Sequence, residues 1–175
     1  MLSRYVPAEK LQTEFLNPWR NADKYAEGDP FAPANYDFGY LAAISFAGQP
    51  LAWMEASNLP EEAFATGDLI RAYREISSEF HSGIILPIGE EPSGRSWTGF
   101  QSIISPNEGY LLIYREDNPA KKARIRTWLP EGRRVRLVPV LGSGRSIRSK
   151  VGADGCICLK IREKNSSKLY KYLIK

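Results

Sequence analysis

The stretch QPLAWMEASNLPEEAF, residues 49–64, determines how the rest of the chain is organised. It opens with the short apolar run 50–54, which is typical of a strand buried on both faces of a parallel sheet. Glu55 follows at the carboxyl end of that strand. Pro60 and the two glutamates after it suit a first helical turn, because proline lacks only an N–H that has no intrahelical partner there, and carboxylates favour the positive end of the helix dipole. The stretch therefore predicts a βα unit.

Further helices are predicted on both sides of this strand. Residues 39–47, GYLAAISFA, are apolar all round and predict a buried helix. Residues 64–80 carry apolar side chains at spacings of three and four, which predicts an amphipathic helix that stops in a left-handed conformation near Gly83. Upstream, the spacing of Leu11, Phe15 and Trp19 predicts one bent helix or two short ones.

After Gly83 the hydrophobic period changes from 3.6 to 2. Turn residues separate eight strand-like runs, which cover 83–89, 95–104, 109–116, 122–129, 133–141, 145–152, 155–162 and 168–175. Asp154-Gly155 is the strongest hairpin signal among the turns. The expected fold is α+β, with a mostly helical, βα-type segment at 1–82 and an antiparallel β-sandwich at 83–175.

Charge is divided unevenly between these two halves. Residues 1–80 carry 6 basic and 12 acidic side chains, a net −6, whereas residues 81–175 carry 18 and 8, a net +10. Most basic residues alternate with apolar ones, as in RRVRLVPV at 133–140, which is typical of the solvent face of half-buried strands. We therefore do not expect nucleic acid as a partner, although an acidic polymer on this basic sheet stays an alternative.

Several other classes of site are not expected. Cys156 and Cys158 point to one face of a strand and suit small strand side chains, and one histidine, His81, gives no four-ligand metal site, so neither metal nor cofactor is predicted. No apolar run is long enough to span a membrane, and the residues after Met1 do not read as a secretory signal, so the sequence does not indicate a cellular location.

Three runs occur in one order along the chain: PLAWMEASNLPEEAF at 50–64, ILPIGEEPSGRSWTGFQSI at 85–103 and GYLLIYRE at 109–116. Together they resemble the C-terminal part of the α-galactosidase-like glycoside hydrolases, which join a catalytic (β/α)8 barrel to an antiparallel β domain. The resemblance covers roughly residues 1–116. It implies that residues 1–82 are the end of a barrel, because a whole barrel typically needs about 250 residues.

The same resemblance implies hydrolysis of α-galactosides or related sugars by two carboxyl groups in a retaining mechanism. The catalytic residues of that family belong to earlier barrel strands, so this chain is expected to be catalytically incomplete by itself. The alternative is a non-catalytic carbohydrate-binding or interaction module. Expected partners are a carbohydrate and either the missing part of the barrel or a second copy of the chain, since half a barrel would leave strand 51–54 unpaired and much of helix 39–47 exposed.

Candidate sugar contacts lie where barrel strands end. Glu55 ends the apolar strand, and we assign it to sugar binding or structure rather than to catalysis. Trp53 beside it suits either the core or a stacking surface. Tyr36 belongs to a long Pro- and aromatic-rich loop, where it either lines a sugar pocket or covers the barrel rim.

A second dense motif, GEEPSGRSWTGFQ at 89–101, is explained as a domain junction. Glu90 and Glu91 are expected to pair with Arg95 across the turn. Trp97 and Phe100 are expected to anchor the sheet against the preceding helix.

Overall fold

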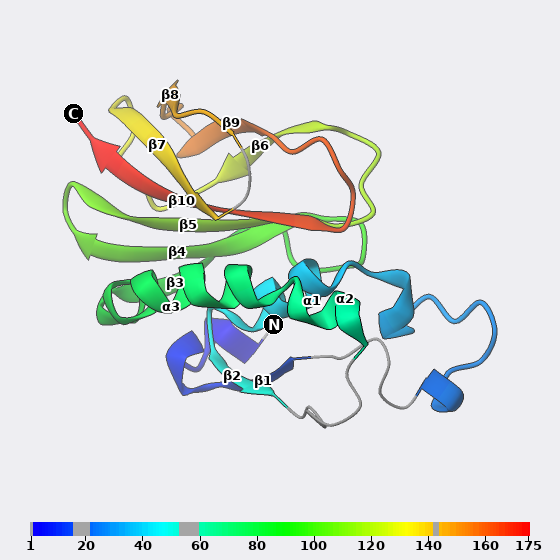
Figure 1. Ribbon diagram of the computed structural model, residues 1–175. Coiled ribbons are helices and arrows are strands. Elements are labelled where there is room, and N and C mark those ends of the chain that lie inside the picture. The colour runs from blue at the N-terminus through cyan, green and yellow to red at the C-terminus, as the bar shows by residue number, and fades with distance from the viewer. Residues whose placement is uncertain (1, 16–21, 53–59, 142–143) are drawn as a thin grey trace.

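The computed structural model describes residues 2–15, 22–52, 60–141 and 144–175. Figure 1 shows helices lying between a large antiparallel sheet and a short parallel strand pair. The helices are α1 (Phe38–Ser45), α2 (Glu61–Phe64) and α3 (Gly67–Ser82), with short 3₁₀ turns at Leu2–Arg4, Ala8–Lys10, Ala22–Lys24 and Pro33–Asn35. The strands are β1 (Gln12–Phe15), β2 (Gln49–Ala52), β3 (Ile84–Gly89), β4 (Trp97–Ser105), β5 (Glu108–Arg115), β6 (Lys122–Arg126), β7 (Arg134–Leu141), β8 (Ile147–Lys150), β9 (Cys156–Lys160) and β10 (Ser166–Ile174).

The C-terminal half is the predicted antiparallel β structure, and each of the eight expected runs contains a strand. Six strands form one sheet in the order β3-β4-β5-β10-β7-β8, and β6 pairs with β9 in a second, small sheet. The α+β fold with a β-sandwich is therefore confirmed.

Two apolar cores lie on opposite faces of the six-stranded sheet. One core joins this sheet to the small sheet and contains Leu111, Ile113, Ile125 and Ile157. The other joins it to the helices and contains Tyr110, Leu112 and Tyr114, packed with residues of α1 and α3. Alternate residues of β5 thus point to opposite cores, as the pleat requires. Both faces of the strand are buried, so it is almost continuously apolar.

Helix α3 confirms the amphipathic prediction, and Phe80 on it is fully buried. Polar contacts also join this helix to the sheet: Lys171 Nζ lies 2.8 Å from Glu79 Oε1, and Tyr110 Oη donates to Glu79 Oε2 at 2.5 Å. The expected left-handed stop is wrong, because Gly83 is extended with φ −86° and ψ 172° and leads directly into β3.

The helix predicted through Leu11 and Phe15 is wrong. Residues 12–15 form β1, which pairs in parallel with β2 in a register that places Gln12 opposite Gln49. A spacing of four residues fits a helix, yet the backbone bonds to β2 come from a segment more than thirty residues away and decide the conformation here. Trp19 lies outside the described residues.

Helix α1 follows β1 in the chain and precedes β2, so these elements form a βαβ unit. Asp37 caps α1, since its Oδ1 accepts from the backbone N–H of Gly39 at 2.8 Å and of Tyr40 at 3.2 Å. The buried helix is confirmed, and the expectation that much of it would be exposed is wrong: only Ile44 of α1 is exposed, because β1, β2, α3 and the large sheet pack around the rest.

Strand β2 differs from the expected strand buried on both faces. Gln49 and Pro50 are exposed and Leu51 is half-buried, so at these positions β2 is open to solvent. The helical part of the fold has no membrane span: none of the described helices is both long and apolar enough to cross a bilayer.

Asp154-Gly155 forms the predicted turn but not the predicted hairpin. Gly155 has φ +72° and its N–H donates to the carbonyl of Gly152 at 3.0 Å. The flanking strands nevertheless separate, since β8 pairs with β7 and β9 pairs with β6. The turn therefore passes the chain from one sheet of the sandwich to the other.

Candidate functional site

The sequence places its candidate sugar contacts at the carboxyl ends of β1 and β2. Trp53 and Glu55 come directly after β2, and both lie outside the described residues. Tyr36 is described and precedes α1 in the connection from β1. The geometry of this end of the parallel pair therefore rests on Tyr36 and the loop around it.

Tyr36 is half-buried and held at two points. Its hydroxyl donates to the carbonyl oxygen of Pro30 at 2.8 Å, and its ring stacks on Tyr40, with 6.0 Å between ring centroids and 30° between planes. Tyr40 in turn meets the ring of Tyr114 edge-on at 6.3 Å. This row of rings runs from the loop into the helix-side core, so Tyr36 is a fixed aromatic surface in the loop before α1.

Carboxylates of the same loop are used to shape its backbone. Asp29 Oδ1 accepts from the N–H of Phe31 at 2.8 Å, and the carbonyl of Asp29 accepts from the side-chain amide of Asn35 at 2.7 Å. Asp37 caps α1. Both acids thus have backbone partners, which leaves Glu55 as the carboxylate that the sequence assigns to sugar contact at this end.

A hollow lies at the opposite, amino ends of β1 and β2. Its volume is about 730 Å³, and its lining comes from the Ala8–Lys10 turn, α1, the start of β2 and α3. Tyr73 and His81 line it, and desolvation lowers the pKa of His81, against smaller effects of a hydrogen bond to the Phe46 backbone and of the charge on Glu9. In βα barrels this end contributes to stability rather than to chemistry.

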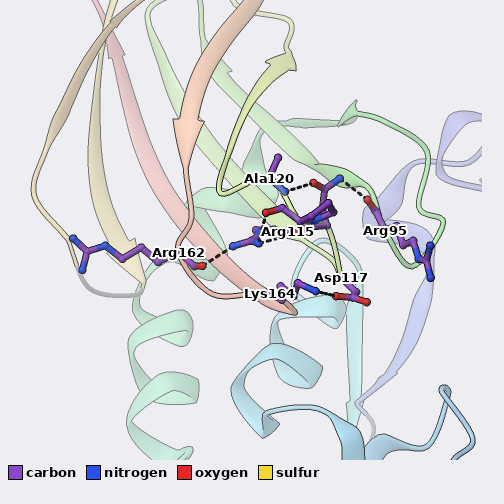
Figure 2. Close-up of polar contacts among 8 residues, drawn as sticks. Arg95, Arg115, Asp117, Ala120, Arg162 and Lys164 are labelled. Carbon is purple, nitrogen blue, oxygen red and sulfur yellow. Dashed lines mark hydrogen bonds and ion pairs between the residues drawn. The ribbon is translucent and has the colours of Figure 1, made fainter.

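Arg115 is a buried cation that sequence analysis missed. Only 1% of its surface is exposed, and its guanidinium donates to backbone carbonyls alone: Asn118 at 2.6 and 3.0 Å, Pro119 at 3.4 Å, Ile161 at 3.1 Å and Arg162 at 2.5 Å. Figure 2 shows these donors pointing between the loop after β5 and the loop before β10, beside an ion pair of Asp117 and Lys164. Arg115 therefore ties two loops together, and nothing in the sequence indicates its burial, because its partners are backbone carbonyls.

The junction motif at 89–101 is held differently from the prediction. Glu90 Oε2 accepts from the backbone N–H of Trp97 at 3.2 Å, and Glu116 Oε2 accepts from the backbone N–H groups of Ser93 at 3.1 Å and Ser96 at 2.6 Å. A carboxylate from the end of β5, rather than a Glu–Arg pair, thus organises this turn.

Trp97 and Phe100 do not anchor the same layer. Trp97 belongs to the core between the two sheets, whereas Phe100 packs against the core beneath the helices. An odd separation of three residues in a strand places two side chains on opposite faces, which explains the error.

The basic alternation predicted at 133–140 is confirmed as an exposed face. Arg134 and Arg136 are exposed, whereas Val135 and Leu137 between them are buried. Among the described residues, no group of three or more His, Cys, Asp or Glu side chains is arranged to hold a metal ion, and Cys156 and Cys158 are free thiols.

Comparison with solved structures shows where this fold occurs. The chain matches the galactosidase domain of the α-galactosidase–sucrose kinase AgaSK with a TM-score of 0.62 and 12% identity, over 99% of this chain and 23% of that one. It matches the GH36 α-galactosidase AgaA from Geobacillus stearothermophilus with a TM-score of 0.56 and 12% identity, over 86% of this chain and 21% of that one.

A maltogenic α-amylase, AmyB from Thermotoga neapolitana, shares the fold with a TM-score of 0.59 and 10% identity, over 94% of this chain and 41% of that one. No protein-family model matches the sequence, and neither does any curated protein. The chain thus spans about a fifth to two fifths of the length of these solved structures. It has the fold of the C-terminal regions of GH36 α-galactosidases and α-amylases.

Proposed function

We propose that this chain is the C-terminal part of a glycoside hydrolase that acts on α-galactosides or related sugars, and that it is catalytically incomplete alone. One observation carries the proposal. A parallel βαβ unit, a covering helix α3 and an antiparallel sandwich follow one another in this chain, and the same fold extends over 99% of it in AgaSK. In this proposal residues 1–82 are the end of the barrel and residues 83–175 are the separate C-terminal domain.

The open parallel pair supports the incomplete state. Among the described strands β1 and β2 pair only with each other, so each has an unpaired edge, and β2 leaves Gln49 and Pro50 in solvent. The missing barrel strands, or a second copy of the chain, would cover this region. The isolated chain should therefore dimerise in sedimentation velocity, and a monomer at every concentration would argue against the half-barrel.

The chemistry is tested with aryl α- and β-glycosides of several sugars. We expect the purified chain to release no nitrophenol from any of them. Turnover that is abolished by Glu55→Gln would contradict the proposal, because the catalytic pair would then lie inside this chain.

Sugar contact at the barrel end is tested by calorimetry with stachyose or galactose. We expect weak binding that falls several-fold in Tyr36→Ala and not in Tyr5→Ala, which removes an aromatic ring that is 85% exposed elsewhere. Equal loss in both variants would mean that Tyr36 has no specific role. Binding without turnover on any glycoside fits both an incomplete hydrolase and a carbohydrate-binding module. The two are distinguished by adding the missing barrel strands, which should restore activity only to a hydrolase.

A further inference from the structure

Trp128 lies just beyond β6 and keeps 59% of its surface exposed. It is nevertheless fixed at two points: its indole Nε1–H donates to the carbonyl oxygen of Pro87 at 3.1 Å, and its backbone N–H donates to Gln101 Oε1 at 2.8 Å. Gln101 is itself buried and bonded through Nε2 to Tyr172 Oη at 3.3 Å. The ring is thus an exposed apolar face that would lose little conformational freedom on binding.

A hollow of about 700 Å³ lies beside this ring. That volume is within the range of small-molecule sites, roughly 300–1,000 Å³. Leu86 and Ile88 of strand β3 line it together with Trp128, and Arg126 and Glu131 are exposed at its rim. An aromatic platform with hydrogen-bonding groups around it suits a ligand that has one apolar face and polar edges.

The charges around the hollow are of both signs. Arg4 and Arg126 lie there with Glu90, Glu131 and Asp154. Two basic and three acidic side chains give this lining donors and acceptors with little net charge, which favours an uncharged ligand over an anion.

A second groove, elsewhere on the sandwich, differs from this hollow in its charge. It has a volume of about 390 Å³, and its charged side chains are all basic, from Arg134, Arg136, Arg148, Lys150 and Lys175. A polyanion would be drawn to that groove rather than to the hollow beside Trp128.

Protection of a sheet edge is the simpler explanation for Trp128. Among the described strands β3 pairs with β4 alone, so the Pro87 carbonyl lies at an edge, and the indole N–H caps it. A polar side chain would cap that carbonyl equally well without leaving a large ring in water. Edge protection therefore accounts for the hydrogen bond, but not for the exposed ring beside a hollow.

We propose that Trp128 is the stacking platform of a carbohydrate-binding surface on the β-sandwich, separate from the Tyr36 region, and that its ligand is a neutral chain of pyranose units. The C–H face of a sugar ring packs on the indole, and sugar hydroxyls bond to Glu131 and Arg126. The choice of a carbohydrate rests on the proposed function, since the hollow alone favours only an uncharged ligand with one apolar face and polar edges.

Affinity electrophoresis of the full chain tests this surface. Gels containing galactomannan or amylopectin should retard the parent chain, and Trp128→Ala should weaken binding about ten-fold or more, as truncation of an aromatic anchor does. Trp128→Phe should keep part of the retardation. Tyr5→Ala, which removes another exposed ring, should migrate like the parent, and thermal unfolding of each variant verifies its fold.

Three outcomes would overturn the inference: retardation of Trp128→Ala equal to that of the parent, no retardation of the parent by either polysaccharide, or stronger retardation by polygalacturonate than by both neutral polymers. These experiments also distinguish an error in the Trp128 inference from an error in the proposed function. Stachyose binding that depends on Tyr36 would persist if only the Trp128 surface were wrong, whereas retardation that depends on Trp128 would persist if only the barrel-end site were wrong.

Discussion

Tyr73 and His81, two turns apart on α3, share a hydrogen bond of 2.8 Å between Oη and Nε2. The Tyr73 hydroxyl also donates its proton to the carbonyl oxygen of Phe46, at 2.6 Å. A hydroxyl has a single proton to give, so the remaining bond requires His81 to donate from Nε2. This relationship assigns the Nε2–H tautomer and joins α3 to the end of α1 through two buried or half-buried groups.

The His81 site predicts how stability depends on pH. Its pKa is lowered in the folded chain, chiefly by desolvation, from an ordinary value of ~6.5. The unfolded chain therefore binds the proton more readily, so this contribution to stability is present above about pH 6.5 and is lost as the pH falls through the folded pKa. Urea midpoints of the parent should decrease from pH 7.5 to pH 5.5, and those of His81→Gln should decrease less.

Carboxylates change the stability of the chain at lower pH than His81 does, so their titration can be distinguished from that of His81. The pKa of Glu79 is lowered by its hydrogen bonds to Lys171 and Tyr110, so its contribution is present above the ordinary range of a glutamate and is lost only at more acidic pH. Identical midpoints for parent and His81→Gln at every pH would contradict the role given to His81.

Replacing Arg115 should destabilise the sandwich. Arg115→Lys removes the planar fork that reaches carbonyls of two loops at once, and Arg115→Ala leaves those carbonyls without donors. We expect the free energy of unfolding to fall by about 3 kcal/mol or more in the alanine variant and by a smaller amount in the lysine variant. Urea denaturation measures both.

Arg162 provides the matched control, because only its backbone carbonyl takes part and its side chain is exposed. Arg162→Lys should change stability by less than about 0.5 kcal/mol. An Arg115→Lys variant as stable as this control would show that a single ammonium group can replace the guanidinium.

Two glycines should respond to alanine in opposite ways. A Cβ at Gly99 would lie 2.2 Å from the carbonyl oxygen of Leu112, inside the ladder between β4 and β5, so Gly99→Ala must displace backbone. A Cβ at Gly67 would meet only the flexible end of Arg71, at 3.3 Å, and alanine favours a helix. Thermal unfolding should show a lower midpoint for the first variant and an equal or higher midpoint for the second.

The proposed division at residue 82 predicts the behaviour of residues 83–175 alone. The core between the two sheets lies wholly within this fragment, so it should unfold cooperatively in circular dichroism. Tyr110, Leu112 and Tyr114 would lose the helices that cover them, so the fragment should also be less stable and associate in sedimentation. A fragment without a cooperative transition would place the boundary elsewhere.

Local sequence carried enough information to predict the strands of the sandwich and helices α1 and α3. Alternating apolar residues and turn residues define strands by themselves, and Leu69 to Phe80 repeat at a helical period. Which strands pair with each other was harder to predict from the sequence. Asp154-Gly155 specifies a tight turn but not which sheet each flanking strand joins: β8 pairs with the neighbouring strand Arg134–Leu141, whereas β9 pairs with Lys122–Arg126, thirty or more residues earlier in the chain.

The candidate sites were harder to predict from the sequence, again because they depend on contacts between segments that are far apart in the chain. Strand β1 was taken for a helix because Leu11 and Phe15 are four residues apart, and its partner β2 lies far along the chain. Arg115 gave no warning of burial, since its partners are carbonyls, and any residue type supplies a carbonyl. The sequence predicts a strand over 122–129 that includes Trp128, but β6 ends at Arg126. The alternation of residues along a strand therefore could not predict that Trp128 is exposed.

Strand β10 comes last among the strands and yet lies inside the sheet, between β5 and β7. During synthesis on the ribosome, β5 and β7 therefore emerge with no neighbour at the edges that will face β10. The two halves of the large sheet, β3-β4-β5 and β7-β8, remain separate until Ser166–Ile174 leaves the exit tunnel and joins them. Until then each half exposes an unpaired backbone edge, and such an edge is a template for pairing with other molecules.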